Sequence, residues 1–179
     1  MSNLPLIDFL VGRGISVTAR DRKSREDIGE ELAAGLEKRG VRLIFGEGYL
    51  SGICEGVIFR TPGLRPDVPE LVEAQRRGAI LTSEMELFFE LTPATVIGIT
   101  GSDGKTTTTT LTYMFLDAQL RRNGRGRAYV GGNIGEPLLP RVDEMTDDDF
   151  AVVELSSFQL MTMKRSPNRA AITNITPNH

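Results

Sequence analysis

The sequence has few of the features that mark secreted, membrane-spanning or nucleic-acid-binding proteins. Its single cysteine, Cys54, cannot form a disulfide within the chain. No stretch approaches the roughly 20 apolar residues that a membrane-spanning helix needs. The 21 basic and 24 acidic residues give a net charge of -3, so no overall positive charge attracts DNA or RNA. The N-terminal segment has Asp8 within its apolar part and no basic leader, unlike a secretory signal. We therefore expect a cytoplasmic protein that binds neither membranes nor nucleic acids.

What the sequence does have is the composition of a folded globular protein, with 40% hydrophobic and 25% charged residues. Its 179 residues are long for one domain and short for two, because domains most often have about 100–150 residues. After a helix that starts at residue 4 and ends at Gly12 or Gly14, short strand-like segments alternate with segments of helical pattern. The predicted strands are residues 15–19, 41–45, 56–59 and 79–82, and the predicted helices are residues 24–39, 69–77 and 83–91. This alternation predicts a doubly wound, parallel α/β sheet.

A second α/β unit is predicted after Thr92 and Pro93. Residues 94–100 form a nearly continuous apolar run, which is typical of a strand covered on both faces. A glycine-rich turn follows, and then a helix from Lys105 to about Arg121. Further strands are predicted at residues 127–130, 150–154 and 170–175. We therefore expect a Rossmann-like domain over residues 1–92 and a second parallel-sheet domain over residues 93–179.

The most specific motif is Gly-Ser-Asp-Gly-Lys-Thr-Thr, between the buried strand and the long helix. Glycines let the backbone turn tightly so that successive N–H groups point toward phosphate oxygens, and the helix N-terminus adds a favourable field. Lys105 would reach the β- and γ-phosphates, and the Thr106 hydroxyl would ligate Mg²⁺. This is the short GxxGKT form of the P-loop, since Ile99 stands where the longer form has its first glycine. The predicted phosphate site consists of Gly101, Ser102, Asp103, Gly104, Lys105, Thr106 and Thr107.

Two further side chains are candidates for this site. Glu154 ends the apolar strand at residues 150–154, and a P-loop commonly works with a metal-holding acid on a neighbouring strand. The alternative is that Glu154 merely faces solvent at a strand end. His179 is the only histidine, and it follows a strand that leaves through a turn, where α/β sheets place ligand contacts. The pattern alone leaves open whether His179 contributes to the site or is a solvated bystander.

Four segments together resemble the Mur ligase family in order and spacing. They are GITGSDGKTTTT (98–109), YVGGNIGEPLL (129–139), VVELSSFQL (152–160) and AAITNITPNH (170–179). The resemblance covers the whole chain and is most specific in residues 97–179. It is nearest to the members that join D-glutamate to UDP-N-acetylmuramoyl-L-alanine, because the GGNIG and ELSSFQL segments separate these from the other members. It implies an ATP-dependent amide ligase that works through an acyl phosphate.

The resemblance also implies roles for individual residues. Residues 101–107 would bind ATP, and Lys105, Glu154 and His179 would be the catalytic residues. Thr106 and Glu154 would hold the first Mg²⁺, while His179 would assist a second metal and the substrate carboxylate. The second domain would then be the N-terminal part of a central, ATP-binding Mur ligase domain.

The same resemblance implies a substrate site that begins in the first domain. The uridine nucleotide would contact Ser2, Asn3, Asp21, Arg22, Lys23, Thr61, Pro62 and Gly63, and the muramoyl-alanine end would contact Asn133, Ser156 and His179. Asp21, at a predicted strand end, can accept a hydrogen bond from a uracil N–H or a ribose hydroxyl. Gly63 permits close backbone approach. The alternative is that residues 21–23 form a solvated charge cluster.

Some features of the family pattern are not found in these residues. Family members have a strand and a glycine-rich turn before the helix that opens this chain, and a C-terminal part that carries a carbamylated lysine and receives D-glutamate. We therefore expect a fragment that is incomplete, inactive on its own, and monomeric. The alternatives are another Mur ligase or a folylpolyglutamate synthase, or a non-catalytic P-loop nucleotide-binding module. A dinucleotide-dependent oxidoreductase is disfavoured, since no GxGxxG motif occurs.

Overall fold

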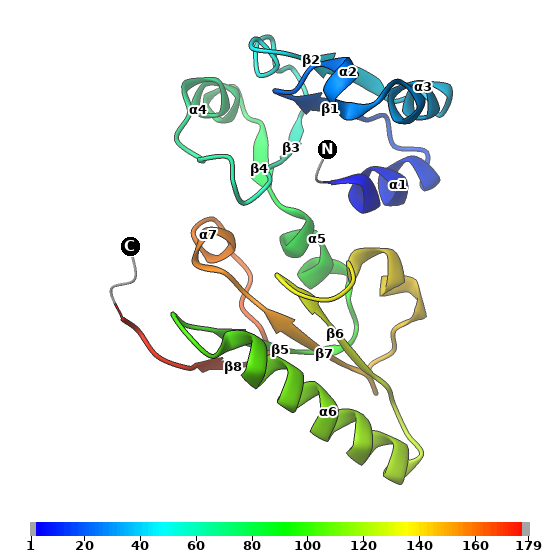
Figure 1. Cartoon of the computed structure of the whole chain (residues 1–179), viewed down its shortest axis with the longest axis vertical. Coiled ribbons are helices and arrows are strands. Elements are labelled where there is room, and N and C mark those ends of the chain that lie inside the picture. The colour runs from blue at the N-terminus through cyan, green and yellow to red at the C-terminus, as the bar shows by residue number, and fades with distance from the viewer. Residues whose placement is uncertain (1–2, 177–179) are drawn as a thin grey trace. The chain divides into compact units, whose positions relative to one another are not determined.

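The computed structural model describes residues 3–176 of the chain (Figure 1). The chain divides into two compact units, Met1–Glu84 and Met85–His179. The sequence places this division after residue 92, whereas in the structure nearly all of helix α5 (Glu84–Leu91) groups with the second unit. Among the helices of residues 3–176, none is both long and apolar enough to cross a membrane.

In the first unit, short parallel strands alternate with helices. The order is α1 (Leu4–Gly12), β1 (Thr18–Asp21), α2 (Arg25–Ile28), α3 (Glu30–Lys38), β2 (Arg42–Phe45), β3 (Val57–Phe59), α4 (Pro69–Arg76) and β4 (Ile80–Thr82). Strand β1 pairs with β2, and β3 pairs with β4, both in parallel. In the described part of this unit the two pairs form separate sheets. The alternation seen in the sequence therefore produces the parallel pairing that it predicts.

Each strand pair of the first unit packs on its own apolar cluster. One cluster is built from Ile7, Ala19, Leu36 and Val41, and the other from Ile53, Leu71, Ala74 and Leu81. Helix α1 begins at Leu4 with a proline in its first turn, where the missing N–H leaves no hydrogen bond unmade.

Two predicted elements of the first unit differ in the structure. The strand predicted at residues 15–19 begins only at Thr18, because Gly14 turns with a φ of 72° and Ile15 is 49% exposed. The helix predicted at residues 24–39 is interrupted at Gly29, whose φ of 99° is incompatible with a continuous helix. Ser24 caps the first of the two resulting helices through a capping box with Asp27.

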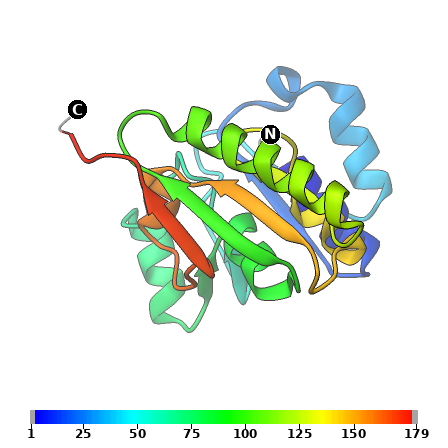
Figure 2. The same cartoon turned by 90° about the horizontal axis from the view of Figure 1, so that it is seen from below.

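The second unit contains one sheet of parallel strands. After α5 the order is β5 (Thr95–Thr100), α6 (Lys105–Asn123), β6 (Ala128–Gly132), the 3₁₀ helix η1 (Leu139–Glu144), β7 (Phe150–Glu154), α7 (Ser157–Leu160) and β8 (Arg169–Ile172). The strands lie in the order β6-β7-β5-β8, and every pair is parallel. Figure 2 shows α6 crossing one face of this sheet. The predicted α/β class with parallel sheets is thereby confirmed.

The centre of this sheet explains where the site lies. Residues 151–153 of β7 are fully buried, as expected of a parallel strand with neighbours on both sides. Because the strands are parallel, their carboxyl ends share one edge, where ligands of open α/β sheets bind. The ends of β5, β6 and β7 therefore bring residues 101–107, Asn133 and Glu154 to one edge of the sheet. Strand β8 ends at Ile172, before the predicted end at residue 175.

Candidate functional site

The turn between β5 and α6 has the shape that the sequence motif predicts. Gly101 follows β5 with a φ of 138°, and Gly104 precedes α6 with a φ of 77°. Both angles lie in the region that glycine adopts readily and other residues avoid. The glycines therefore let the chain reverse into the helix within the four residues between β5 and α6.

The first turn of α6 offers backbone N–H groups at this edge. The first hydrogen bond of the helix runs from the Thr108 N–H to the Gly104 carbonyl, at 2.9 Å. The N–H groups of residues 105–107 precede it and so have no partner within the helix. At a helix N-terminus such groups and the helix dipole together favour a bound anion. At the predicted phosphate site, these N–H groups are therefore free of helix hydrogen bonds and can bind phosphate oxygens.

Lys105 folds back over the turn. Its Nζ donates to the carbonyls of Gly101, at 2.8 Å, and Ser102, at 2.9 Å. Two neutral carbonyl acceptors thus hold the ammonium at the turn. Its positive charge adds to the positive end of the helix dipole.

Glu154 lies at the centre of the site. It ends β7, opposite Ile99 of β5 on one side and Gly132 of β6 on the other. The residue is only 1% exposed, so the alternative that it faces solvent is wrong. Its Oε2 accepts a hydrogen bond from the Thr106 hydroxyl at 2.8 Å, and its Oε1 accepts one from the Asn133 side-chain amide at 3.0 Å. The side chains of Thr106, Glu154 and Asn133 therefore contact one another beside the N-terminus of α6.

The turn after β6 approaches Glu154 more closely than a side chain at residue 132 would allow. The Asn133 N–H donates to the Glu154 carbonyl at 2.9 Å. Gly132 has a φ of 98°, and a Cβ placed on it would lie 2.2 Å from that same carbonyl oxygen. Only glycine fits this position without a backbone shift. The contact with Glu154 therefore explains the glycine at position 132, whereas a Cβ on Gly131 would instead meet Leu138 and the Glu136 carbonyl oxygen.

These side chains fit a magnesium–nucleotide site. Mg²⁺ takes oxygen ligands and is commonly held through one or two protein groups together with substrate phosphates. The Thr106 hydroxyl and the Glu154 carboxylate supply such oxygens within hydrogen-bond distance of each other, next to the helix N-terminus. Within residues 3–176 there is no cluster of three or more histidine, cysteine and acidic residues that would instead indicate a metal centre built from protein ligands alone.

Ser156 is also brought to this edge, but the structure gives its hydroxyl a local partner. Ser156 caps helix α7 through a capping box, in which its Oγ accepts from the Gln159 N–H at 3.3 Å and donates to the Gln159 Oε1 at 3.0 Å. Its contact with a substrate remains a prediction, as does that of Asn133.

The residues predicted to bind uridine lie at strand ends of the first unit. Asp21 is the last residue of β1, and its Oδ1 accepts a hydrogen bond from the Lys23 N–H at 3.0 Å. Arg22 and Lys23 are exposed. Residues 61–63 form the turn that follows β3, and Asn3 precedes α1. Ser2 and His179 lie outside the described residues.

Arg60, beside this turn, is a candidate that the sequence motifs do not indicate. Arg60 follows β3 directly and is only 4% exposed. Its Nη1 donates to the carbonyls of Thr61 and Pro62, both at 3.1 Å, and to the carbonyl of Leu64. Burial lowers the pKa of the guanidinium. A charged residue directly after an apolar strand and before a Thr-Pro-Gly turn was the available signal.

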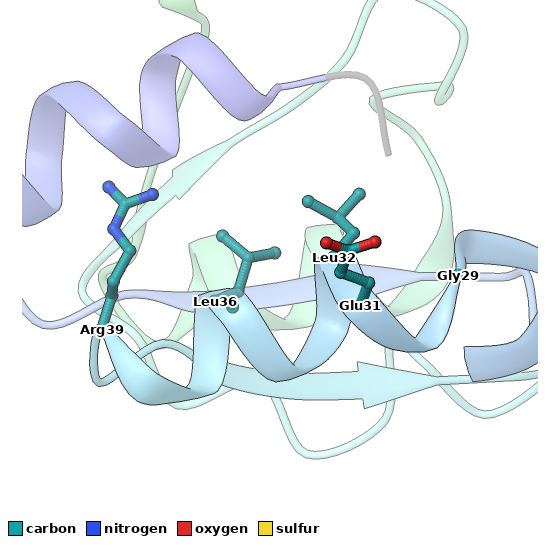
Figure 3. A pocket seen from close by; sticks show the side chains of 6 residues that line it. Gly29, Glu31, Leu32, Leu36 and Arg39 are labelled. Atoms are coloured by element: carbon teal, nitrogen blue, oxygen red, sulfur yellow. The ribbon is translucent and has the colours of Figure 1, made fainter.

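A hollow of about 570 Å³ on the first unit is lined by none of the residues predicted to bind phosphate, metal or uridine. It runs along α3 and is lined by Gly29, Glu31, Leu32, Gly35, Leu36 and Arg39. Figure 3 shows Leu32, Leu36 and Arg39 pointing toward the neighbouring helix α1. Arg39 pairs there with Asp8 at 2.5 Å. No lining residue belongs to a predicted site.

Comparison with known proteins gives a consistent result for the second unit and for the whole chain. Residues 99–179 match the family model described as the Mur ligase middle domain. The chain is 51% identical over 180 aligned residues to the UDP-N-acetylmuramoylalanine–D-glutamate ligase of Clostridium kluyveri, and 54% identical over 181 to the ligase of that name from Clostridium botulinum strain Okra. Both alignments include all of this chain and 38% of the relative.

Proposed function

The chain belongs to the Mur ligase family, and we propose that it forms part of an ATP-dependent ligase that adds D-glutamate to UDP-N-acetylmuramoyl-L-alanine. The similarity at 51–54% identity to ligases named for D-glutamate favours this member over other Mur ligases and over folylpolyglutamate synthase. The main observation in support is the hydrogen bond from the Thr106 hydroxyl to the Glu154 carboxylate at the N-terminus of α6.

In the proposed reaction, a carboxylate oxygen of the L-alanine end forms a bond to the γ-phosphorus of ATP, and the bond from that phosphorus to the bridging oxygen of ADP breaks. The amine of D-glutamate then attacks the acyl phosphate, so that an amide forms and inorganic phosphate leaves with loss of the amine proton. Phosphoryl transfer of this kind depends mainly on positioning and charge neutralisation.

The residues at the sheet edge would supply both requirements. The N–H groups of residues 105–107 would hold the phosphate oxygens, and Lys105 would exchange its two carbonyl contacts for the β- and γ-phosphates. Thr106 and Glu154 would hold Mg²⁺, which supplies further neutralisation of phosphate charge. His179 and Asn133 would orient the reacting carboxylate, and Ser156 would contact the same end of the substrate.

The uridine nucleotide would bind to the first unit. Asp21 ends a parallel strand and residues 61–63 follow another, which is where such sheets bind nucleotides. Ser2, Asn3, Arg22 and Lys23 complete the proposed set. Because the proposed substrates are ATP and a nucleotide-linked sugar, we place the reaction in the cytoplasm.

The chain spans 38% of the length of the ligases it matches. We propose that these 179 residues hold ATP and the uridine substrate but do not complete ligation alone.

A chimera tests the proposed activity. This chain would replace the aligned segment of the C. kluyveri ligase, and phosphate release would be measured with UDP-N-acetylmuramoyl-L-alanine, ATP and D-glutamate. We expect release that requires all three substrates and is lost on Lys105→Ala, while Lys38→Ala, at an exposed lysine of α3, leaves it unchanged.

Two results of the same assay would contradict the proposal. A folded chimera that binds ATP but releases no phosphate in response to the substrates would indicate a non-catalytic nucleotide-binding module. Preference for an amino acid other than D-glutamate would indicate a different member of the family.

A further inference from the structure

The segment that follows β8 runs directly along the phosphate loop, residues 101–104. The Thr173 N–H donates to the Thr100 carbonyl at 2.9 Å, and the Ser102 N–H donates to the Asn174 carbonyl at 3.0 Å. We call residues 173–176 the buttress segment. It continues the pairing of β5 with β8 beyond the last residues of both strands. The loop therefore has a backbone partner along its length, in continuation of the pairing of β5 with β8.

Side chains of the buttress segment bind both peptide groups of Asp103. The Asn174 Oδ1 accepts from the Asp103 N–H at 3.0 Å, and the Asn174 Nδ2 donates to the Asp103 carbonyl at 3.2 Å. The Thr173 hydroxyl donates to the same carbonyl at 2.6 Å. Asp103 is the residue immediately before Gly104, at which the chain turns into α6. These three bonds fix the two peptide planes on either side of the Asp103 Cα, and hence the direction in which the helix starts.

The Ser102 side chain is bound to the buttress segment as well. Its Oγ donates to the Thr176 carbonyl and accepts from the Thr176 N–H, both at 2.9 Å. In this arrangement the hydroxyl and the N–H of Ser102 both face the buttress segment. The loop groups left for a phosphate are those of Gly104 and the first turn of α6.

Gly101, the first glycine of the loop, leaves room for these contacts with the buttress segment. A Cβ on Gly101 would lie 2.1 Å from the Thr173 hydroxyl and 2.9 Å from the Asn174 carbonyl oxygen. Glycine at this position therefore leaves room for the buttress segment as well as permitting the φ of 138°.

We infer that Thr173 and Asn174 are positioning residues that hold the phosphate loop in its binding shape before the nucleotide arrives. This inference rests on the proposed function, because it concerns how the same site takes the phosphates of ATP. A loop with glycines at both ends has many conformations, and ordering it upon binding weakens affinity. The side-chain bonds of Thr173 and Asn174 order it beforehand.

The test uses the 179-residue chain and single substitutions. Asn174→Ala removes two side-chain bonds to Asp103 and keeps the backbone bond to Ser102. Thr173→Val removes the hydroxyl at nearly constant size, and Thr173→Ser restores it. The control is Asn168→Ala, because the Asn168 Oδ1 accepts from the Val96 N–H at 2.8 Å, at the end of β5 remote from the loop.

Three quantities would be measured: the hydrogen exchange of the Asp103 amide by NMR, the Kd for Mg·AMP-PNP by calorimetry, and the urea midpoint of unfolding. For Asn174→Ala we expect the exchange rate and the Kd each to rise roughly tenfold, because side-chain hydrogen bonds to the loop are lost. Thr173→Val should change both in the same direction, and Thr173→Ser should resemble the wild type. Asn168→Ala should lower the urea midpoint without altering exchange at Asp103 or Kd.

The inference is overturned if Asn174→Ala and Thr173→Val leave the Kd and the Asp103 exchange unchanged, or if Asn168→Ala raises Kd as much as they do. If Asn174→Ala does not fold, the comparison of Thr173→Val with Thr173→Ser decides. A wild-type chain that binds no Mg·AMP-PNP would overturn the proposed function instead, and the exchange rates would still decide whether Asn174 holds the loop.

Discussion

Replacing Glu154 by glutamine removes a buried negative charge while keeping the size of the side chain. Glu154 is 1% exposed and bonds to the Thr106 hydroxyl and the Asn133 amide. A glutamine can keep both contacts, with its oxygen accepting from Asn133 and its NH₂ donating to the Thr106 oxygen. We therefore expect the free energy of unfolding to change by less than about 1 kcal/mol, as for an isosteric change that leaves no buried group unpaired.

The effect on magnesium-dependent binding should be much larger. Two unit charges 4 Å apart interact by about 4 kcal/mol at an effective dielectric constant of about 20. Desolvation offsets part of this attraction, and hydrogen bonds to charged groups typically contribute about 1.5–3 kcal/mol. Since about 1.4 kcal/mol corresponds to a factor of ten, Glu154→Gln should weaken binding of Mg·AMP-PNP about 10- to 100-fold.

Calorimetric titration of the 179-residue chain measures this effect. With EDTA in place of Mg²⁺, Glu154→Gln should leave the affinity for AMP-PNP unchanged or increase it, because Glu154 then only repels the phosphates. Glu144→Gln serves as the charge-matched control, since Glu144 is exposed and paired with Arg141 on η1. Equal affinities of wild type and Glu154→Gln for Mg·AMP-PNP would refute the assignment of Glu154 to the metal. So would an equal loss with and without Mg²⁺.

Three further substitutions test other contacts. Gly132→Ala should destabilise the chain by at least about 2 kcal/mol, measured by urea unfolding, because its Cβ would overlap the Glu154 carbonyl oxygen at an unfavourable φ; an unchanged urea midpoint would contradict this. Arg60→Met should raise the Kd for UDP, measured by calorimetry, because the carbonyls of the Thr-Pro-Gly turn lose their donor; an unchanged Kd at reduced stability would mean that Arg60 serves folding alone. Glu55→Gln tests pH dependence: burial alone would raise the pKa of Glu55, but hydrogen bonds from the Thr18 side chain and the backbone, together with Arg20, lower it overall. The wild type should therefore be more stable than Glu55→Gln above the unfolded pKa of about 4.5, and lose that advantage as pH falls through the lower folded value; a difference that grows on acidification would contradict the assignment.

The elements around the phosphate loop were predictable because their signals are local. A buried strand, two glycines with positive φ and a helix start follow one another within residues 95–105, and each is set by its own residues. The break of the helix at Gly29 was missed because a single glycine within a helical pattern is often tolerated. In the structure Gly29 is both the C-cap residue of α2 and the residue that precedes α3.

Contacts between distant segments could not be predicted in the same way. Asn174 is 71 residues from Asp103 in the chain, and nothing in its own neighbourhood indicates that its amide binds the loop. In the sequence Glu86 looks like an ordinary surface residue of α5. In the structure it is buried, and its carboxylate accepts hydrogen bonds from the N–H groups of Lys164 and Arg165 at 2.9–3.0 Å. Such partners are determined by how distant segments pack together in the folded chain, which local sequence patterns do not encode.

In the proposed site, residues 105–107 and Glu154 hold the phosphates and the metal of a nucleotide. A crystal structure of the chain with Mn²⁺ and AMP-PNP tests it most directly, because the anomalous signal locates the metal independently of the phosphates. We expect the metal at the Thr106 hydroxyl and the Glu154 carboxylate, bound directly or through one water, with the β- and γ-phosphates at the N–H groups of residues 105–107. A metal bound away from both side chains, or phosphates bound away from the start of α6, would contradict it.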